Sequence, residues 1–363
     1  MVIVLFIAGL VCLIVGAEAL VRGASRLAAA FGLSPLVIGL TVVAFGTSSP
    51  ELAVSIKSAL SDQASIGVGN VVGSNIFNIL FILGLSALIV PLAASQQLVR
   101  FDVPLMIAIS LLVLVYSLDG IFSRTEGLTL VAGLVIYLSF LMIQSRRENV
   151  GAQDTDTKEH RLEGNKKYSW VRDIAFVLFG FALLVLGSRW LVGSAVSFAQ
   201  YLGVSELVIG LTIVAAGTSL PEVVTSVIAA IRGERDIAVG NVVGSNIFNI
   251  LGVLGLASVV APNGIRVSPA VIGFDIPVMI AVAFACLPIF YTGGVISRLE
   301  GALFLGYYVA YTLYLILAAS HHDALPSINA VMLYFVIPLT LVTLIITALT
   351  ERHGRKRPPK HNP

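Results

Sequence analysis

Charged side chains are scarce in this sequence. Only 12% of its 363 residues are Asp, Glu, Lys or Arg, against roughly 25% in soluble globular domains. Hydrophobic residues make up 57%, and the mean hydropathy is +0.97. This composition excludes a water-soluble globular enzyme and predicts an integral membrane protein surrounded by lipid bilayer. The formal net charge of +2 is too small to indicate a nucleic-acid partner.

Cysteine and histidine are also rare, which excludes two kinds of centre. Cys12 and Cys286 both lie in apolar runs without a partner at metal-ligand or redox spacing, so we expect two buried packing residues. All histidines lie in expected loops or in the tail: His160, His321, His322, His353 and His361. Their positions argue against a histidine proton relay or a histidine metal site within the membrane.

Long apolar runs fill most of the chain. A helix needs about 20 apolar residues to cross a bilayer, which predicts spans near residues 2–22, 35–60, 66–90, 102–118, 126–144, 171–200, 205–231, 237–261, 273–291, 299–319 and 329–349. The first run ends at Ala17-Glu18-Ala19, a pattern also found at signal-peptide cleavage sites. Because no basic segment precedes this run, we expect a retained first helix.

The second half of the chain repeats the first half at an offset of 171 residues. Gly32–Ser55 matches Gly203–Ser226 at 16 of 24 positions, and Ile66–Leu80 matches Ile237–Leu251 at 14 of 15. Shared apolar composition does not produce identity at this level, so the sequence indicates a duplicated unit of five spans. An odd number of spans places the second unit in the membrane upside down relative to the first, as in many transporters.

The expected fold is an all-α polytopic membrane protein of about 11 helices, built from two inverted five-helix repeats with broken helices. Its expected parts are a first repeat at residues 1–145, a cytoplasmic linker at 146–169, a second repeat at 170–320, an extra transmembrane helix at 329–349 and a basic cytoplasmic tail at 350–363. With the amino terminus outside, 18 of the 22 basic residues fall on the cytoplasmic side. The positive-inside rule therefore predicts an outside amino terminus and a cytoplasmic carboxyl terminus in a plasma or inner membrane.

Two copies of a polar motif interrupt the apolar runs. Thr41–Glu51, TVVAFGTSSPE, and Thr212–Glu222, TIVAAGTSLPE, each combine hydroxyls, a proline and a carboxylate. An ionisable side chain inside a membrane span is energetically costly, so it is expected to face a cavity or a partner rather than lipid. The two motifs therefore indicate a functional site.

Pro50 supplies a physical reason for the first motif. Proline donates no amide hydrogen bond and clashes with the carbonyl four residues earlier, so we expect the helix to open between Ala44 and Ser48. Transporters use carbonyls freed in this way as cation ligands. Thr47 and Ser48 precede Glu51 by four and three residues, which places all three on one helix face. This predicts a cage of oxygen atoms, the ligand type that hard cations prefer.

A second motif, GNVVGSNIFN, is identical at Gly69–Asn78 and Gly240–Asn249. Helix packing explains its glycines, which follow small-xxx-small spacing. Packing does not explain its polar residues. Interhelical hydrogen bonding remains an alternative for Asn75 and Asn246. We expect the other polar residues to be ligands that face the carboxylate helix of their own repeat: Ser74, Asn78, Ser245 and Asn249.

GTSSPE and GTSLPE, each followed by GNVVGSNIFN, resemble the two alpha repeats of the cation/calcium exchanger superfamily, and of its prokaryotic sodium/calcium exchanger branch in particular. The resemblance covers the first ten spans. It implies that Glu51 and Glu222 are central carboxylates shared by calcium and sodium, with the ions as transported substrates and no cofactor. Further oxygens implied as metal ligands belong to Thr47, Thr218, Ser48, Ser219, Ser74, Ser245, Asn78, Asn249, Ala44 and Ala215.

This sequence departs from the family pattern at one position. Relatives often carry aspartate at one of the two positions occupied here by Asn78 and Asn249, so the site has only two formal carboxylates. Potassium-dependent members share an acidic residue there, which makes potassium use less expected. Two glutamates neutralise one calcium or two sodium ions. The predicted function is therefore antiport of Ca²⁺ against Na⁺ by alternating access, in a protein that functions as a monomer.

Three other functions remain alternatives. Calcium/proton exchange would use the desolvated glutamates as proton carriers, although a proton-coupled site has less use for the paired serines. A channel would use the glutamates as a selectivity ring, but such pores are usually shared by several subunits. An intramembrane hydrolase would use Glu51 and Glu222 as acid and base, yet Ser48 has no histidine or lysine partner in sight. We therefore expect a transporter without catalytic residues.

Overall fold

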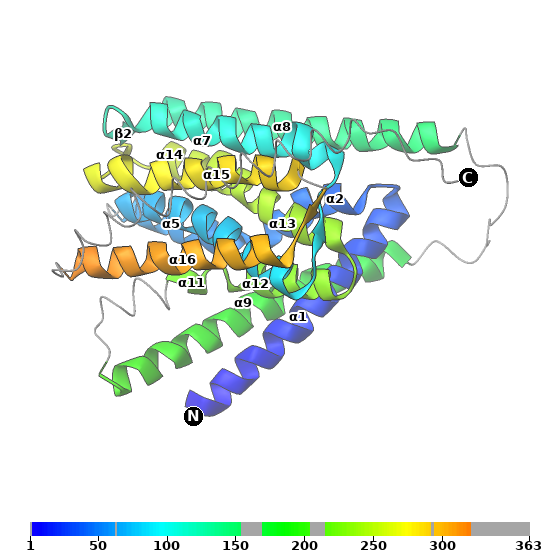
Figure 1. The fold of residues 1–363 in the computed structure, drawn as a ribbon, viewed down its shortest axis with the longest axis horizontal. Helices are drawn as coiled ribbons and strands as arrows, with labels where there is room; N and C mark the ends of the chain where they lie inside the picture. Colours follow the sequence, from blue (N-terminus) through cyan, green and yellow to red (C-terminus); the bar gives the residue numbers. More distant parts are fainter. Residues whose placement is uncertain (1, 62–63, 154–168, 204–214, 292–293, 321–363) are drawn as a thin grey trace, which may run out of the picture.

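The structure is a computed structural model that describes residues 2–61, 64–153, 169–203, 215–291 and 294–320. Within these ranges the chain is almost entirely helical (Figure 1). Eight described helices are long and apolar enough to cross a membrane, and the bent pair Pro35–Thr47 and Ser49–Leu60 adds a ninth if it is taken as one span. The protein is therefore an all-α polytopic membrane protein. The expected eleventh span, the tail and the five histidines lie outside the described residues.

The first unit follows the predicted spans closely. Its elements are α1 (Val2–Phe31), α2 (Pro35–Ile38), η1 (Gly39–Val43), α3 (Ala44–Thr47), α4 (Ser49–Leu60), α5 (Ala64–Phe77), η2 (Asn78–Leu83), α6 (Gly84–Ile89), β1 (Leu92–Ala93), η3 (Leu98–Asp102), α7 (Val103–Ser117), β2 (Ile121–Phe122) and α8 (Arg124–Gln153). Elements written η are π-helical turns. Two helices extend beyond the predicted ends: α1 continues from residue 22 to Phe31, and α8 continues to Gln153, through the start of the expected linker. A hydropathy window detects the apolar part of a helix, whereas polar residues with good helix propensity extend it.

The second unit repeats this order. Its elements are α9 (Ser169–Tyr201), α11 (Ala215–Gly217), α12 (Leu220–Ile231), α13 (Arg235–Phe248), η6 (Asn249–Leu254), α14 (Gly255–Val260), β3 (Ile265–Arg266), η7 (Val271–Asp275), α15 (Ile276–Tyr291), β4 (Val295–Ile296) and α16 (Arg298–Ala319). The first ten residues of the expected span 205–231, 205–214, lie outside the described residues.

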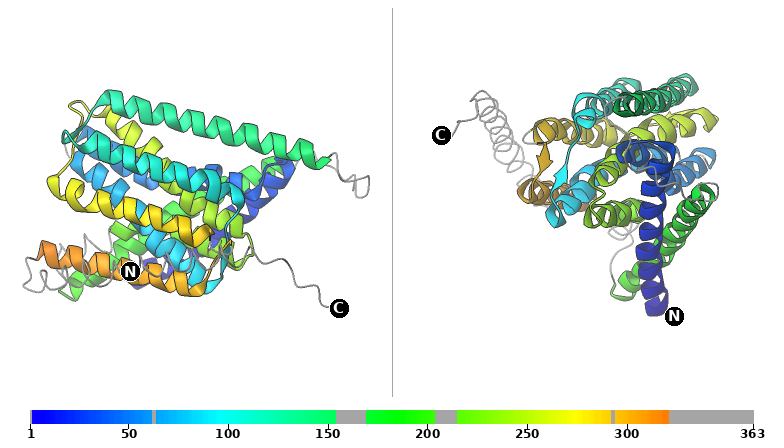
Figure 2. Two further views of the ribbon diagram at one scale, coloured as in Figure 1. Left: turned by 45° about the horizontal axis from the view of Figure 1, so that its top comes forward. Right: turned by 90° about the vertical axis from the view of Figure 1, so that its right-hand side faces the viewer.

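Helices α1 and α9 pack directly against each other. In Figures 1 and 2 they run obliquely to α7, α8, α15 and α16, which lie nearly parallel. Glycine allows this close approach: a Cβ on Gly16 would lie 2.9 Å from the Gly180 carbonyl oxygen, and a Cβ on Gly187 would lie 2.7 Å from that of Gly9. Small residues drive helix association in membranes because they bring backbones together. The two helices therefore form one closely packed pair.

Contacts between the two units come in reciprocal pairs. β1 pairs antiparallel with β4, and β2 pairs antiparallel with β3. Glycines repeat the pattern between helices: Gly84 approaches Gly301 on α16, and Gly127 on α8 approaches Gly255. Among the described spans, Arg235–Val260 is the most buried, with 89% of its 18-residue apolar stretch inside the protein. The GNVVGSNIFN motif of the second unit is therefore at the centre of the molecule.

Candidate functional site

The first broken helix opens at Ser48. α3 ends at Thr47 and α4 begins at Ser49, while Ser48 itself has φ −82° and ψ 6°, outside helical geometry. The two parts meet at a bend of 46°. Pro50 lies in the first turn of α4, where a missing amide hydrogen costs nothing. The predicted opening is therefore confirmed at Ser48 only, because Ala44–Thr47 stays helical and the Ala44 carbonyl accepts from the Ser48 amide at 3.0 Å.

The second broken helix opens at the equivalent residue. α11 ends at Gly217 and α12 begins at Leu220, with Ser219 at φ −88° and ψ 8° between them. Thr218 lies in the same turn, and Ala215 begins α11. Two non-helical serines therefore mark equivalent breaks in the two units.

Glu51 and Glu222 are brought together across these breaks. Both are buried, with relative exposures of 0% and 1%. The Ser48 hydroxyl donates to Glu222 Oε1 at 3.0 Å, and the Ser219 hydroxyl donates to Glu51 Oε1 at 2.8 Å. Each serine stands three residues before the carboxylate of its own helix, so the two contacts are reciprocal. Both glutamates face protein rather than lipid.

Each glutamate lies in the first turn of the helix that restarts after the break. The amino-terminal end of a helix carries unsatisfied N–H groups and a partial positive charge, which stabilises negative side chains there. The breaks therefore create two helix starts inside the protein, and a carboxylate occupies each start. The two helix starts therefore offset part of the electrostatic cost of burying the carboxylates.

Several oxygens at this site are buried without a hydrogen-bond partner among the described residues. They are Glu51 Oε2, Glu222 Oε2, Asn78 Oδ1, Asn249 Oδ1 and Ser245 Oγ. An unpaired buried polar atom costs about 1–3 kcal/mol. A dehydrated cation would pair with such oxygens, and Ca²⁺ takes about 6–8 of them. The described residues contain no cluster of three or more His, Cys, Asp or Glu side chains, so two carboxylates and neutral oxygens would hold the ion.

The GNVVGSNIFN copies lie beside the broken helices. Ser74 is on α5, Ser245 is on α13, and both are buried. Ser74 Oγ lies 3.3 Å from Ser219 Oγ, within hydrogen-bond distance. This contact reaches the broken helix of the other repeat, because the reciprocal crossing of the two breaks brings Ser219 beside Glu51 of the first unit.

Asn78 and Asn249 each begin a π-helical turn, η2 and η6. π-Turns within α-helices are frequent at functional sites because they displace a side chain from the regular helix face. Asn249 Nδ2 donates to Asn75 Oδ1 at 3.1 Å, and Asn75 Nδ2 donates to the Asn246 carbonyl at 3.3 Å. The interhelical role considered for Asn75 is confirmed. The hydrogen bond between Asn75 and Asn249 uses the side-chain nitrogen of Asn249. The side-chain oxygen of Asn249 has no hydrogen-bond partner among the described residues.

Two further asparagines support the site, and the sequence interpretation gave them no role. Asn70 donates to the Glu51 carbonyl at 3.3 Å and to Ser55 at 3.1 Å. Asn241 donates to the Glu222 carbonyl at 3.5 Å and accepts from the Thr47 hydroxyl at 3.1 Å. Asn70 and Asn241 occupy the same position in the two copies of GNVVGSNIFN. This identity was the sequence signal that could have indicated a role for them. They fix the backbone that carries each glutamate.

Asn241→Ala should weaken transport more than Asn70→Ala. Among the described residues, only Asn241 of the two contacts the opposite unit, through Thr47, so its loss loosens both broken helices. Removing one partner of a buried hydrogen bond costs about 1–3 kcal/mol, which corresponds to a roughly tenfold or greater loss of ion affinity. Concentration dependence of calcium uptake in proteoliposomes measures this change, and equal apparent affinities in the two variants would contradict it.

Other polar residues have structural partners. Glu18 and Arg22, four residues apart, form an ion pair within α1. The Arg298 guanidinium donates to the Ile89 carbonyl at 3.4 Å, which caps the end of α6. Cys12 and Cys286 are both free. Cys286 is buried as expected, whereas Cys12 is only partly buried, because α1 turns this residue toward the edge of its packed face.

Fold and site together define a polytopic helical membrane protein with a buried, oxygen-lined and acidic centre. Residues 1–143 and 173–317 match the sodium/calcium exchanger protein family, and the chain belongs to that family. The sodium/calcium exchanger MaX1 of Methanosarcina acetivorans is 34% identical over 338 residues, which cover 84% of this chain and 95% of MaX1. The putative antiporter CaxA of Alkalimonas amylolytica is 39% identical over 306 residues, with the same two coverages of 84% and 95%.

Solved structures agree with the sequence relatives. The sodium-calcium exchanger NCX_Mj, soaked with 10 mM Na⁺ and zero Ca²⁺, superposes with a TM-score of 0.72 at 32% identity, covering 88% of this chain and 99% of that chain. The inner membrane protein YrbG of Escherichia coli K12 is 39% identical over 285 residues, covering 78% of this chain and 87% of YrbG. The resemblance seen in the sequence motifs is confirmed.

Proposed function

We propose that this protein is a secondary active antiporter that exchanges Ca²⁺ for Na⁺ by alternating access, with both ions competing for the site between Glu51 and Glu222. One observation carries the proposal. Each buried glutamate accepts a serine hydroxyl of the other unit on one oxygen and keeps its second oxygen unpaired. The two negative charges neutralise one Ca²⁺ or two Na⁺, so either cargo fills the site and excludes the other. Competition for one site produces antiport.

The proposed ligands combine side-chain and backbone oxygens. Glu51 and Glu222 supply charge, and the neutral side-chain oxygens come from Ser48, Ser219, Ser74, Ser245, Asn78 and Asn249. Backbone carbonyls would come mainly from Thr47, Thr218, Ala44 and Ala215. Ca²⁺ accepts both kinds of oxygen in flexible geometry. The unpaired oxygens of Asn78, Asn249 and Ser245 support this set.

Sodium is the preferred counter-ion because the site contains many neutral oxygens. A proton needs only a carboxylate, whereas Na⁺ needs a shell of oxygens to replace its water. MaX1 and NCX_Mj are both named sodium/calcium exchangers, which supports the same coupling here. Calcium/proton exchange is the second candidate, because burial of both carboxylates favours their neutral form.

The proposed architecture is a pair of inverted five-helix repeats with the amino terminus outside. The reciprocal pairings β1 with β4 and β2 with β3 support a two-fold relation between the units. The basic residues support the orientation. A complete pair of carboxylates within one chain supports transport by a monomer.

The α1–α9 pair is the proposed moving part. It packs through backbone and glycine contacts as a unit, and it also touches the site: the Ser188 hydroxyl on α9 donates to the Gly217 carbonyl at 2.7 Å, directly beside the second break. Sliding of this pair along the broken helices would expose the site to one side of the membrane and then to the other. Alternating access in transporters is largely the movement of one nearly rigid group of helices against another.

The test is calcium-45 flux in proteoliposomes with sodium, potassium and proton gradients imposed one at a time. We expect uptake driven by an outward sodium gradient and no uptake driven by potassium alone, because Asn78 and Asn249 are both uncharged. Uptake driven by a pH gradient without sodium would support the proton-coupled candidate instead. Currents far above transporter turnover would indicate a channel.

A further inference from the structure

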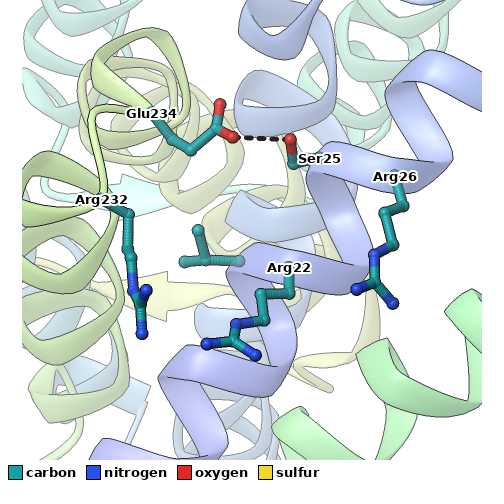
Figure 3. A pocket seen from close by; sticks show the side chains of 6 residues that line it. Arg22, Ser25, Arg26, Arg232 and Glu234 are labelled. Atoms are coloured by element: carbon teal, nitrogen blue, oxygen red, sulfur yellow. Dashed lines mark hydrogen bonds between the residues drawn. The ribbon is translucent and has the colours of Figure 1, made fainter.

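A pocket of about 290 Å³ lies at one end of the α1–α9 pair. It opens between α1 and the turn that joins α12 to α13, and Figure 3 shows its polar lining. The lining residues are Val21, Arg22, Ser25, Arg26, Arg232 and Glu234. Gly233, at φ +83°, makes the tight turn that places Arg232 and Glu234 on either side of it.

Two polar contacts join α1 to the α12–α13 turn at this pocket, one within its lining and one beside it. Arg232 Nε donates to Glu18 Oε2 at 2.9 Å, and a second guanidinium nitrogen of Arg232 pairs with Glu18 Oε1. The Ser25 hydroxyl donates to Glu234 Oε1 at 2.7 Å. Bidentate arginine–carboxylate pairs are stronger and more directional than single contacts. Four side chains therefore tie α1 to the α12–α13 turn.

These contacts join the proposed moving part to the proposed ion site. α1 belongs to the closely packed pair with α9, whereas α12 carries Glu222 and α13 carries Ser245. Any sliding of α1 along the core must break the contacts of Glu18 with Arg232 and of Ser25 with Glu234. The neighbouring ion pairs do not have this property, because Arg22 pairs with Glu18 within α1, and Arg26 lies 3.7 Å from Asp173 on α9.

The other end of the α1–α9 pair carries different residues at the positions that the 171-residue repeat makes equivalent. At the offset of 171, Glu18 corresponds to Arg189, Arg232 to Ser61 and Ser25 to Val196. Neither the arginine–glutamate pair nor the serine–glutamate contact is reproduced by these residues. Within the described ranges, Arg189 forms no ion pair. Among the described residues, this ionic tie is therefore found at one end of the α1–α9 pair and has no counterpart at the equivalent positions.

We propose that Glu18, Arg232, Ser25 and Glu234 form a gate latch that holds one access route to the ion site closed. The latch is at the end of the molecule that the basic residues predict to be cytoplasmic. The latch rests on the proposed alternating access. It stabilises the conformation that is closed to the cytoplasm relative to the conformation that is open to the cytoplasm. These four are positioning residues, because they set which side the site faces without touching the ion.

Thiol labelling tests the latch directly. Val21 lines the pocket and is 2% exposed, so Val21→Cys in a Cys12→Ala, Cys286→Ala background reports each opening. In detergent, with an uncharged water-soluble thiol reagent, Glu18→Gln or Arg232→Gln should raise the labelling rate about fivefold, the change that corresponds to loss of a pair worth about 1 kcal/mol. The matched controls Arg22→Gln and Arg26→Gln also remove a pocket arginine, but they leave the cross-pocket pair intact and should leave the rate unchanged.

Cross-linking supplies the second measurement. Glu18→Cys with Arg232→Cys, joined by a short cleavable bifunctional reagent, should lose at least about nine-tenths of calcium flux and recover it on cleavage. Equal labelling rates in Arg232→Gln and Arg22→Gln, or full flux in the cross-linked protein, would overturn the latch. Labelling reports the opening without any transported ion. If the wild-type protein carries no calcium while the Val21→Cys variants show the labelling difference, the proposed function is refuted and the latch is not.

Discussion

Glu51→Gln and Glu222→Gln are each expected to abolish calcium uptake into sodium-loaded proteoliposomes. Each substitution removes one of two charges from a buried site and leaves a single carboxylate to balance a divalent ion. The remaining charge cannot replace the hydration of Ca²⁺, and loss of one partner from a buried charge pair costs about 3–5 kcal/mol. This corresponds to a loss of more than a hundredfold in affinity. Initial rates of calcium-45 uptake measure the effect.

A matched control distinguishes loss of the ion site from loss of the fold. Glu300 accepts hydrogen bonds from Ser297 in a capping box at the start of α16, and glutamine serves the same capping role. Glu300→Gln should therefore retain wild-type flux with the same change of charge. Elution of all three variants as single symmetric peaks would confirm folding. Near-normal flux in either site variant would contradict the assignment of the carboxylates.

Gly187→Ala is expected to separate the α1–α9 pair and to stop transport. The added Cβ would lie 2.7 Å from the Gly9 carbonyl oxygen and 2.9 Å from the Leu13 amide nitrogen, both backbone atoms that cannot move aside. Overpacking of this kind costs about 1–3 kcal/mol. A lower thermal midpoint in detergent and a large loss of calcium flux should both follow, because the proposed mechanism needs α1 and α9 to move together.

Gly193→Ala is the matched substitution on the same helix. Among the described residues, no atom outside the glycine's own helix surroundings lies within 4 Å of a Cβ at this position, and alanine favours a helix over glycine by about 1 kcal/mol. Its thermal midpoint should equal or exceed that of the wild type, with flux unchanged. If Gly187→Ala behaves in the same way, the close packing of the two helices has no functional importance.

Much of the fold follows from the sequence because its main signals are local. The length of each apolar run predicts a span, and Pro50 predicts the break at Ser48 through a clash within the same helix. The repeated motifs predict that Glu51 and Glu222 are equivalent. Each of these inferences requires only residues close together in the chain, or a comparison of one half with the other.

The remainder depends on contacts between distant residues, which no local pattern specifies. The pairing of Glu18 with Arg22 follows from helical spacing, but its second partner, Arg232, is 214 residues away. The support that Asn241 gives to Glu222 depends on how α12 and α13 pack. The π-turns that begin at Asn78 and Asn249 contain no proline from which they could be predicted. Hydropathy also missed the polar continuation of α8 to Gln153.

The reciprocal strand pairings have a consequence for any chain of half this length. β1 and β2 find their partners only in β4 and β3, so a solitary unit would leave two strand edges unmatched, with nothing to cover them. Such a half could match these edges only by pairing with a second copy through the same strands. Under the proposed inverted arrangement, that copy would have to enter the bilayer in the opposite orientation, and joining two units in one chain would fix both orientations.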